Sequence, residues 1–257
     1  MKKFVKSVER ILNLFPISLK DKIYEIALFY IPIRILKLIP CSYSAYLKCY
    51  EPARGDIVMD CGAHIGNCSL LFSRLVKDEG LVIAVEPVED SFHSLKKKIE
   101  RLNIKNVTLV NKGLWNSDEK LLVRIVPGTG MVVFVKDKPP DAAGQSRTGS
   151  QQEREIEENY LWIDGIKLDS LVKKLGPDRL DFIKMDIEGI EIEALEGAQE
   201  TIMKYSPHFA IASYHIRDKK KTFFQVEGFL EERGYSVRTF FEPHLTTCAR
   251  RKTDSSA

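Results

Sequence analysis

The sequence predicts an α/β fold, namely a doubly wound, mostly parallel seven-stranded sheet with an N-terminal helical extension. From residue 56 onward, apolar runs of strand length alternate with segments of helical periodicity, which is typical of parallel sheets covered by helices on both faces. The first apolar run ends in an acid and a glycine-bearing turn, Asp-Cys-Gly-Ala-His-Ile-Gly at 60–66. The last two apolar runs are close enough in sequence to form an antiparallel hairpin that closes the sheet.

The length of the chain, 257 residues, suits one large α/β domain with an extension. We expect a helical cap at 1–50 and the α/β domain at 51–257, with a polar loop insertion at about 137–155. The apolar segment at 23–40 is interrupted by charges and prolines, so neither a membrane span nor a signal peptide is expected. The sequence does not predict the oligomeric state.

Charge and cysteine content narrow the class of protein. With 39 basic and 36 acidic side chains, the net charge of +3 is too balanced to indicate a nucleic-acid partner by itself. The five cysteines form no C-x-x-C pair, and Cys61 and Cys68 flank the glycine turn. We therefore expect reduced thiols and a cytoplasmic protein.

The individual elements follow from periodicity and from breaking residues. Residues 1 to about 50 alternate apolar and basic positions at helical spacing, which predicts two or three short helices that pack as a cap. Strands are expected at 57–60, 81–86, 107–111, 163–168, 180–185, 208–214, 235–240 and 245–249. A further hairpin, at the ligand edge, is expected from 121–126 and 131–135. Helices are expected at 67–76 with Asn67 as cap, 90–102, 169–175 with Asp169 as cap, 191–204 and 222–233.

The glycine-bearing turn and the acid after the next strand predict the cofactor. Gly62 and Gly66 let the backbone pass close to a ligand, and the first N–H groups of the following helix are free to donate. Glu86 stands about twenty residues further on, the spacing of an acid that binds ribose hydroxyls. A pyrophosphate would need closely spaced glycines, but His64 holds the middle position and Asp60 adds a repelling carboxylate. That carboxylate suits the ammonium of S-adenosylmethionine, which we expect as cofactor; a plain structural turn is the alternative.

The carboxyl ends of parallel strands meet in one crevice, so the residues that follow the strands are expected to converge there. Asp60 and the Gly62 backbone would hold the methionine end of the cofactor, and Glu86 the ribose diol. An apolar wall for the adenine would come from the loop at 113–115, while His64 is expected to be a turn residue rather than a base. The residues expected to bind the cofactor are Asp60, Gly62, Ala63, His64, Gly66, Glu86, Pro87, Gly113, Leu114 and Trp115.

Four motifs stand at or beside the ends of the predicted strands: Asp60-x-Gly62-Ala63-x-x-Gly66, Glu86-Pro87, Leu-Asp-Ser-Leu at 168–171, and Phe-Ile-Lys-Met-Asp-Ile-Glu-Gly-x-Glu at 182–191. Together they resemble the FkbM-type methyltransferase family, over about residues 55–215. The last motif is the most specific, because its charges end an otherwise apolar strand. The resemblance implies a class I, Rossmann-like methyltransferase that uses S-adenosylmethionine and commonly acts on hydroxyl oxygens of small molecules or glycans.

Catalytic residues are expected after the fourth and fifth strands of the sheet. Asp186 would lie at the transferred methyl, where a carboxylate serves either a hydroxyl or an amine acceptor. The expected catalytic residues are Asp186, Glu188, His215 and Tyr214. Three structural alternatives stay open: Glu188 as a cap of the following helix, an ion pair between Lys184 and Glu191, and a metal site of Asp186, Glu188 and His215, although we expect no metal.

The methyl acceptor is left open between RNA, at a base amine or ribose, and a hydroxyl of a small molecule or glycan. Basic residues at 217–221 stand beside Phe223 and Phe224, and positive charge next to aromatic rings suits single-stranded nucleic acid. More basic residues follow near the C-terminus: Arg238, Arg250, Arg251 and Lys252. A different class, a non-catalytic binding protein acting through its N-terminal helices, is disfavoured by the acids at the active edge.

Overall fold

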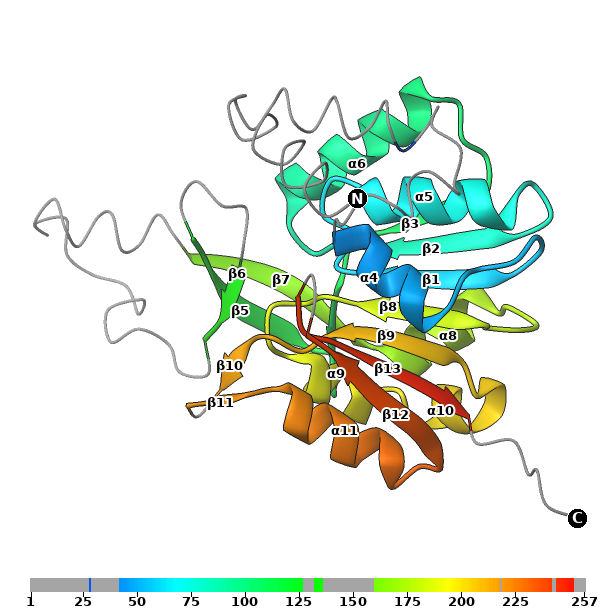
Figure 1. The fold of residues 1–257 in the computed structure, drawn as a ribbon. Coiled ribbons are helices and arrows are strands. Elements are labelled where there is room, and N and C mark those ends of the chain that lie inside the picture. Colours follow the sequence, from blue (N-terminus) through cyan, green and yellow to red (C-terminus); the bar gives the residue numbers. More distant parts are fainter. Residues whose placement is uncertain are drawn as a thin grey trace, which may run out of the picture.

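The computed structural model describes residue 28 and residues 42–126, 132–135, 160–217, 219–241 and 244–251. Its main sheet has seven strands in the order β12-β13-β9-β8-β1-β2-β3 (Figure 1). All neighbours are parallel except β13, which runs antiparallel to both β9 and β12. The strands are β1 (Ile57–Cys61), β2 (Leu81–Val85), β3 (Val107–Val110), β8 (Phe182–Met185), β9 (His208–Ala212), β12 (Tyr235–Phe240) and β13 (Thr246–Arg251). The predicted doubly wound sheet with a closing antiparallel strand is confirmed.

Helices cover both faces of the main sheet (Figure 1). Because its central strands are buried on both faces, their sequences are nearly continuous apolar runs. One face packs against α4 (Ser42–Cys49), α5 (Asn67–Val76) and α6 (Glu89–Arg101). The other packs against α8 (Leu168–Leu175), α9 (Glu191–Glu196), α10 (Gln199–Tyr205) and α11 (Phe223–Glu231). The chain leaves β1 towards β2 and β3 and later returns on the other side of β1 as β8 and β9. That reversal creates a crevice at the carboxyl ends of β1 and β8.

A second sheet was not foreseen. It contains β4 (Gly113–Trp115), β5 (Lys120–Ile125), β6 (Val132–Phe134) and β7 (Tyr160–Lys167), in the order β4-β7-β5-β6. The hairpin of β5 and β6 was expected, and the run at 163–168 was expected as a strand without an assigned partner. It belongs to β7, which pairs with β4 and β5. An apolar run specifies a strand but not its partner, and here the partner lies about forty residues away.

The single helix expected at 191–204 is two helices, α9 and α10, that meet at Gly197. A Cβ on Gly197 would overlap the backbone oxygen of Trp115, so glycine allows α9 to approach β4 closely. The small two-stranded ladder of β10 (Ile216–Arg217) and β11 (Lys220–Lys221) was not expected either.

Both predicted helix caps are wrong. The cap position of α5 is Gly66, in the left-handed conformation, and the Asn67 side-chain oxygen instead accepts a hydrogen bond from Lys98 at 2.8 Å. Asp169 lies inside α8 and accepts from the backbone N–H of Glu200 at 3.0 Å and Thr201 at 2.8 Å. It therefore satisfies the free N–H groups of α10, a neighbouring helix.

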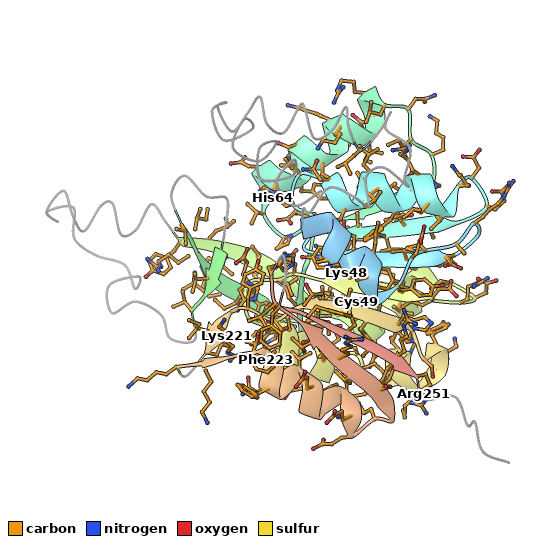
Figure 2. The ribbon with its side chains drawn as sticks, in the orientation of Figure 1. Lys48, Cys49, His64, Lys221, Phe223 and Arg251 are labelled. Carbon is orange, nitrogen blue, oxygen red and sulfur yellow. A yellow bond between two sulfur atoms is a disulfide. The ribbon has the colours of Figure 1, made fainter. Side chains whose placement is uncertain are left out.

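The expectation of reduced cysteines is wrong for two of the five. Cys49, at the end of α4 beside the main sheet, forms a disulfide with Cys248 of β13, with a Cα–Cα distance of 4.9 Å (Figure 2). Cys61 and Cys68 are buried free thiols, and Cys41 lies outside the described residues. The paired cysteines are 199 positions apart, so spacing in the sequence could not show their contact. The disulfide removes the reason for expecting a cytoplasmic protein.

Two predicted regions lie largely or wholly outside the described residues. Of the cap at 1–50, the structure describes a helical position at Leu28 and the helix α4, which packs against β9 and β13. The polar insertion at 137–155 is not described at all. None of the helices in the described ranges combines the length and apolar character that a bilayer crossing requires.

Candidate active site

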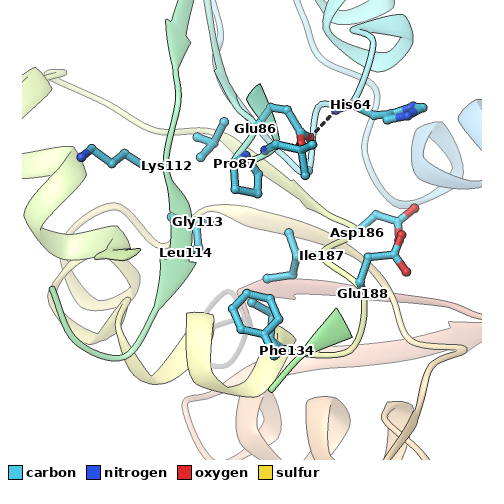
Figure 3. Close-up of a pocket in the computed structure, with 14 residues that line it drawn as sticks. His64, Glu86, Pro87, Lys112, Gly113, Leu114, Phe134, Asp186, Ile187 and Glu188 are labelled. Carbon is cyan, nitrogen blue, oxygen red and sulfur yellow. Dashed lines mark hydrogen bonds between the residues drawn. The ribbon is translucent and has the colours of Figure 1, made fainter. Parts of the chain in front are cut away.

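A cavity of about 220 Å³ lies between the carboxyl ends of β1, β2 and β8 and the second sheet. Figure 3 shows the carboxylates of Asp186 and Glu188 near each other at one side of it, with Gly113 and Leu114 at the other. The lining residues are Gly62, His64, Val85, Glu86, Pro87, Val88, Lys112, Gly113, Leu114, Phe134, Asp186, Ile187, Glu188 and Ile190. Six of the ten residues expected to bind the cofactor are therefore in the lining.

Glu86 is fixed by backbone donors directly after β2. Its carboxylate accepts from the N–H of His64 at 2.7 Å and of Val88 at 2.9 Å, and the residue is 5% exposed. Burial raises the pKa of Glu86, and the two backbone hydrogen bonds offset part of that rise. Each carboxylate oxygen keeps a second lone pair, so the pair of oxygens can still accept from two hydroxyl groups, as a ribose diol would offer.

The glycine turn is shaped chiefly by packing within the protein. Gly62 has φ 74°, and a Cβ there would overlap the backbone oxygen of Asp186. Gly66 has φ 84°, and its Cβ would overlap Leu95. Non-glycine His64 also adopts a left-handed conformation, with φ 49°. Two expected cofactor residues, Gly66 and the buried Ala63, are not in the lining, so the glycines serve the turn more than an approach to ligand.

Asp60 has a protein cation as its partner. It is fully buried, and its Oδ1 lies 3.0 Å from Nζ of Lys184, while its Oδ2 accepts from Ser69 at 2.6 Å. Lys184 also donates to the backbone oxygen of Gly62 at 2.8 Å. Burial lowers the pKa of Lys184, but Asp60, Cys68 and Asp186 together outweigh burial and raise it, so the ammonium stays charged. Asp60 is absent from the lining, and the ammonium that it holds is that of Lys184.

The suggested pair of Lys184 with Glu191 is wrong. Glu191 is fully buried, and its Oε1 lies 3.0 Å from Nδ1 of His215 and accepts from the N–H of Gly189 at 3.1 Å. Glu188 is not the cap of the next helix, because α9 begins three residues later, after Ile190. Glu188 instead lines the cavity in a left-handed conformation with φ 62°, which is strained for a non-glycine residue.

Of the two residues expected to enclose the adenine, one borders the cavity. Leu114 lines the cavity, but Trp115 does not. Trp115 stacks on Phe134 of β6, with ring centroids 5.3 Å apart and planes 7° apart, and Phe134 is the ring that faces the cavity. Phe134 was missed, although it lies in the hairpin expected at the ligand edge. Phe134 could have been predicted as a cavity residue because it is an aromatic residue in that hairpin.

Asp186 follows β8 and is held by two tyrosines. Its Oδ2 accepts from Tyr46 at 2.9 Å and its Oδ1 from Tyr214 at 3.1 Å. Burial and the Asp186 charge raise the pKa of both tyrosines, so both hydroxyls stay protonated and act as donors. Tyr46 was missed because it lies in the N-terminal extension, 140 positions from its partner, with no motif around it.

His215 lies among three carboxylates. Its Nε2 is 3.5 Å from Glu188 and 3.8 Å from Asp186, and its Nδ1 is 3.0 Å from Glu191. Burial lowers the pKa of His215, but Glu188, Glu191 and Asp186 outweigh burial and raise it to about 10. His215 is therefore an imidazolium at neutral pH and cannot accept a proton there. Across the described part of the chain, no group of His, Cys, Asp and Glu is arranged to hold a metal ion.

The basic residues considered for RNA binding, at 217–221 and near the C-terminus, do not form one cluster. Arg217 is 2.6 Å from Glu193, which leaves Lys219, Lys220 and Lys221 as the exposed cations of that segment. Figure 2 shows Lys221 and the C-terminal Arg251 on opposite sides of the molecule. Three of the basic residues near the C-terminus contact other parts of the protein. Arg250 donates to the backbone oxygen of Cys49, Arg251 donates to that of Arg233, and Arg238 stacks on Phe240. The fourth, Lys252, lies outside the described residues.

The strand order and a cavity that joins Glu86 to Asp186 define a class I methyltransferase that uses S-adenosylmethionine. The sequence profile of the "Methyltransferase FkbM domain" matches residues 60–237, and the chain belongs to this family. Family membership favours the enzyme over the non-catalytic alternative.

Curated relatives and a solved structure agree with this assignment. Methyltransferase 1 of Beauveria bassiana (strain ARSEF 2860) is 21% identical, over 74% of this chain and 77% of the relative. Methyltransferase sdnD of Sordaria araneosa is 24% identical, over 74% of this chain and 78% of the relative. The crystal structure of methyltransferase FkbM from Methylobacillus flagellatus KT has a TM-score of 0.53 at 18% identity, covering 84% of this chain and 52% of that chain. The last likeness concerns the fold alone.

Proposed function

We propose that the enzyme methylates a hydroxyl oxygen of a small molecule or glycan, and that Asp186 receives the proton of that hydroxyl. The observation that carries this proposal is the environment of Asp186. It borders the cavity, its side chain is 25% exposed, and its neighbours Tyr46, Tyr214 and His215 are all held protonated. Among these four groups, the carboxylate of Asp186 is the one able to accept a proton at neutral pH.

The residues of the cavity fit S-adenosylmethionine. Glu86 would accept from the ribose diol, and Leu114 and Phe134 would enclose the adenine. The carboxylate of Glu188 suits the positive charge at the methionine end. When bound, the cofactor supplies an electrophilic methyl group, which passes to the acceptor oxygen as the carbon–sulfur bond breaks. The roles of individual residues are part of our proposal.

Asp186 is oriented for this role by its hydrogen bonds. Tyr46 uses one lone pair of Oδ2, and Tyr214 uses one of Oδ1, which leaves a lone pair on each oxygen for the acceptor hydroxyl. The imidazolium of His215 lies 3.8 Å from Oδ1 and places a positive charge beside the carboxylate. Glu188 is a second carboxylate at the same side of the cavity and would contact the acceptor.

The function is tested with labelled S-adenosylmethionine and separate pools of small metabolites, glycans and RNA. We expect label in the small-molecule or glycan pool, and expect that mild base hydrolysis leaves the label in place, as for an ether. Label confined to RNA would contradict the proposal. The Asp186→Asn variant serves as the control that ties the label to this site.

RNA remains a second candidate because of one observation. Lys219, Lys220 and Lys221 are all exposed on the ladder of β10 and β11, and Phe224 nearby is 62% exposed. Together they offer phosphate contacts and a stacking ring directly after the strand that leads to Tyr214. Changing the three lysines to Ala should weaken acceptor binding in a salt-dependent way if the acceptor is RNA, and should leave KM for a neutral acceptor unchanged.

We also propose that residues 1–50 form a helical cap on the α/β domain of 51–257. The support is α4, which lies against β9 and β13 and brings Tyr46 to Asp186. A variant that lacks residues 1–50 and still transfers methyl groups at the wild-type rate would count against a cap that belongs to the site.

A further inference from the structure

Tyr46 is the residue of the N-terminal segment that reaches the reactive carboxylate. It is 1% exposed, so it cannot touch an acceptor, yet its hydroxyl donates to Oδ2 of Asp186 at 2.9 Å. The ring is held from two sides, by Nζ of Lys184 at 5.6 Å from its centre and by the edge of His244 at 5.5 Å. His244 also meets the ring of Tyr214 at 5.5 Å, so one imidazole lies against both tyrosines that bind Asp186.

Two kinds of bond to β13, a disulfide and hydrogen bonds from Arg250, fix the helix that carries Tyr46. Cys49, three positions after Tyr46 and so on the neighbouring turn of α4, forms the disulfide with Cys248. The carbonyl oxygen of Cys49, at the C-terminus of α4, accepts from Nη2 of Arg250 at 2.7 Å and from Nε at 3.1 Å. Both bonds hold the end of α4 to the sheet that carries the active site.

We propose that Tyr46 is a positioning residue for Asp186 and that the Cys49–Cys248 disulfide holds it in place, so that the oxidation state of this disulfide controls turnover. The inference rests on the proposed role of Asp186. It extends that role to a residue and a cross-link that lie outside the cavity lining.

The disulfide would control turnover by keeping the Asp186 carboxylate in its orientation. With α4 tethered, Asp186 is held from both sides, by Tyr46 and by Tyr214, and its free lone pairs point to the acceptor. A dithiol reduces the disulfide by exchange: it gives two electrons and two protons, the two cysteines become thiols, and the reagent leaves as its own disulfide. The end of α4 then keeps the Arg250 bonds and its packing on β9 and β13 but loses its covalent link, so the Tyr46 hydroxyl is held less firmly. Small displacements of this kind cost rate rather than cofactor affinity.

The first test compares Tyr46→Phe with Tyr50→Phe. Tyr50 is a matched control, because its hydroxyl also donates to a carboxylate, Asp56 at 2.8 Å, outside the cavity lining. We expect Tyr46→Phe to lower kcat about tenfold or more, the scale of one lost bond to a charged group, with KM for S-adenosylmethionine unchanged. Tyr50→Phe should change neither.

The second test measures kcat of the oxidised and the dithiothreitol-reduced full-length protein. We expect reduction to lower kcat of the wild type about threefold or more and reoxidation to restore it, while Tyr46→Phe shows no further response to reduction. Cys248→Ala should match the reduced wild type in either buffer, and a circular dichroism spectrum of each species confirms that it is folded.

Three results would overturn the inference: a reduced wild type with full kcat, a Tyr46→Phe variant with full kcat, or a Tyr46→Phe variant that responds to reduction as the wild type does. The proposed function fails separately, if Asp186→Asn keeps full turnover. If Asp186→Asn is inactive and Tyr46→Phe is normal, only the present inference is wrong.

Discussion

Glu86 gives the sharpest prediction for cofactor binding, because each of its contacts is known. Its two oxygens accept from the N–H groups of His64 at 2.7 Å and Val88 at 2.9 Å, and the remaining lone pairs border the cavity. In Glu86→Gln the amide NH2 replaces one oxygen and can no longer accept from a ligand hydroxyl. One lost charge-assisted bond costs about 1.5–3 kcal/mol, which is a roughly 10- to 150-fold rise in Kd.

The assay is isothermal titration of S-adenosylmethionine into the folded variant. Glu89→Gln is a matched control, since Glu89 is exposed at the start of α6 and absent from the cavity lining. The pKa of Glu86 is raised by burial, so wild-type affinity should fall with decreasing pH earlier than an ordinary glutamate would cause, and the variant should lack this dependence. An unchanged Kd in folded Glu86→Gln would refute the assignment of Glu86 to the ribose.

Two further predictions concern packing and charge at the site. Gly62→Ala forces a Cβ against the backbone oxygen of Asp186 at φ 74°, and should lower the free energy of unfolding by about 2–4 kcal/mol in urea titrations. The control is Gly55→Ala, at φ 87° with open space around it, which measures the backbone cost alone, about 1 kcal/mol. Equal losses of stability in the two variants would refute the clash at Gly62. The pKa of His215 is raised to about 10, so its contribution to stability is full below pH 6.5 and is lost as pH rises towards 10. The stability difference between wild type and His215→Gln should therefore shrink over that range, and a constant difference would show that His215 is not held as an imidazolium.

The main sheet could be predicted because its signals are local. Runs such as Leu81–Val85 are apolar on both faces, as buried parallel strands require, and the observed β2 has these bounds. The periodicity of 67–76 likewise gave the bounds of α5. The second sheet was missed because pairing between β4 and β7 depends on partners about fifty residues apart, which no local pattern encodes.

The site was predictable to the extent that it follows strand ends. Glu86 and Asp186 both directly follow apolar strands, and both border the cavity. The partners of charged groups were not predictable in the same way. Asp60 meets Lys184 across adjacent strands, and His215, in the loop after β9, meets Glu191 at the start of α9, so the choice of partner depends on register and loop geometry.

Tyr46, which binds Asp186 but was not among the expected site residues, was also not predictable from the sequence. Tyr46 comes from an extension with no motif, and the helix that carries it is linked to β13 by a disulfide between residues 199 positions apart. The sequence predicts which residues end a strand, whereas a contact from a distant helix can be identified only once the fold is known.

The central claim is that Asp186 accepts a proton during methyl transfer, and Asp186→Asn tests it with little change in size. Turnover is measured as transfer of label from S-adenosylmethionine to the acceptor pool, at a cofactor concentration that saturates both proteins. We predict that Kd for the cofactor stays within about twofold and that kcat falls by about a hundredfold or more, the scale of a lost acid–base group. Unimpaired turnover of the folded variant at saturating substrates would contradict the account, as would a wild-type activity that disappears on metal chelation.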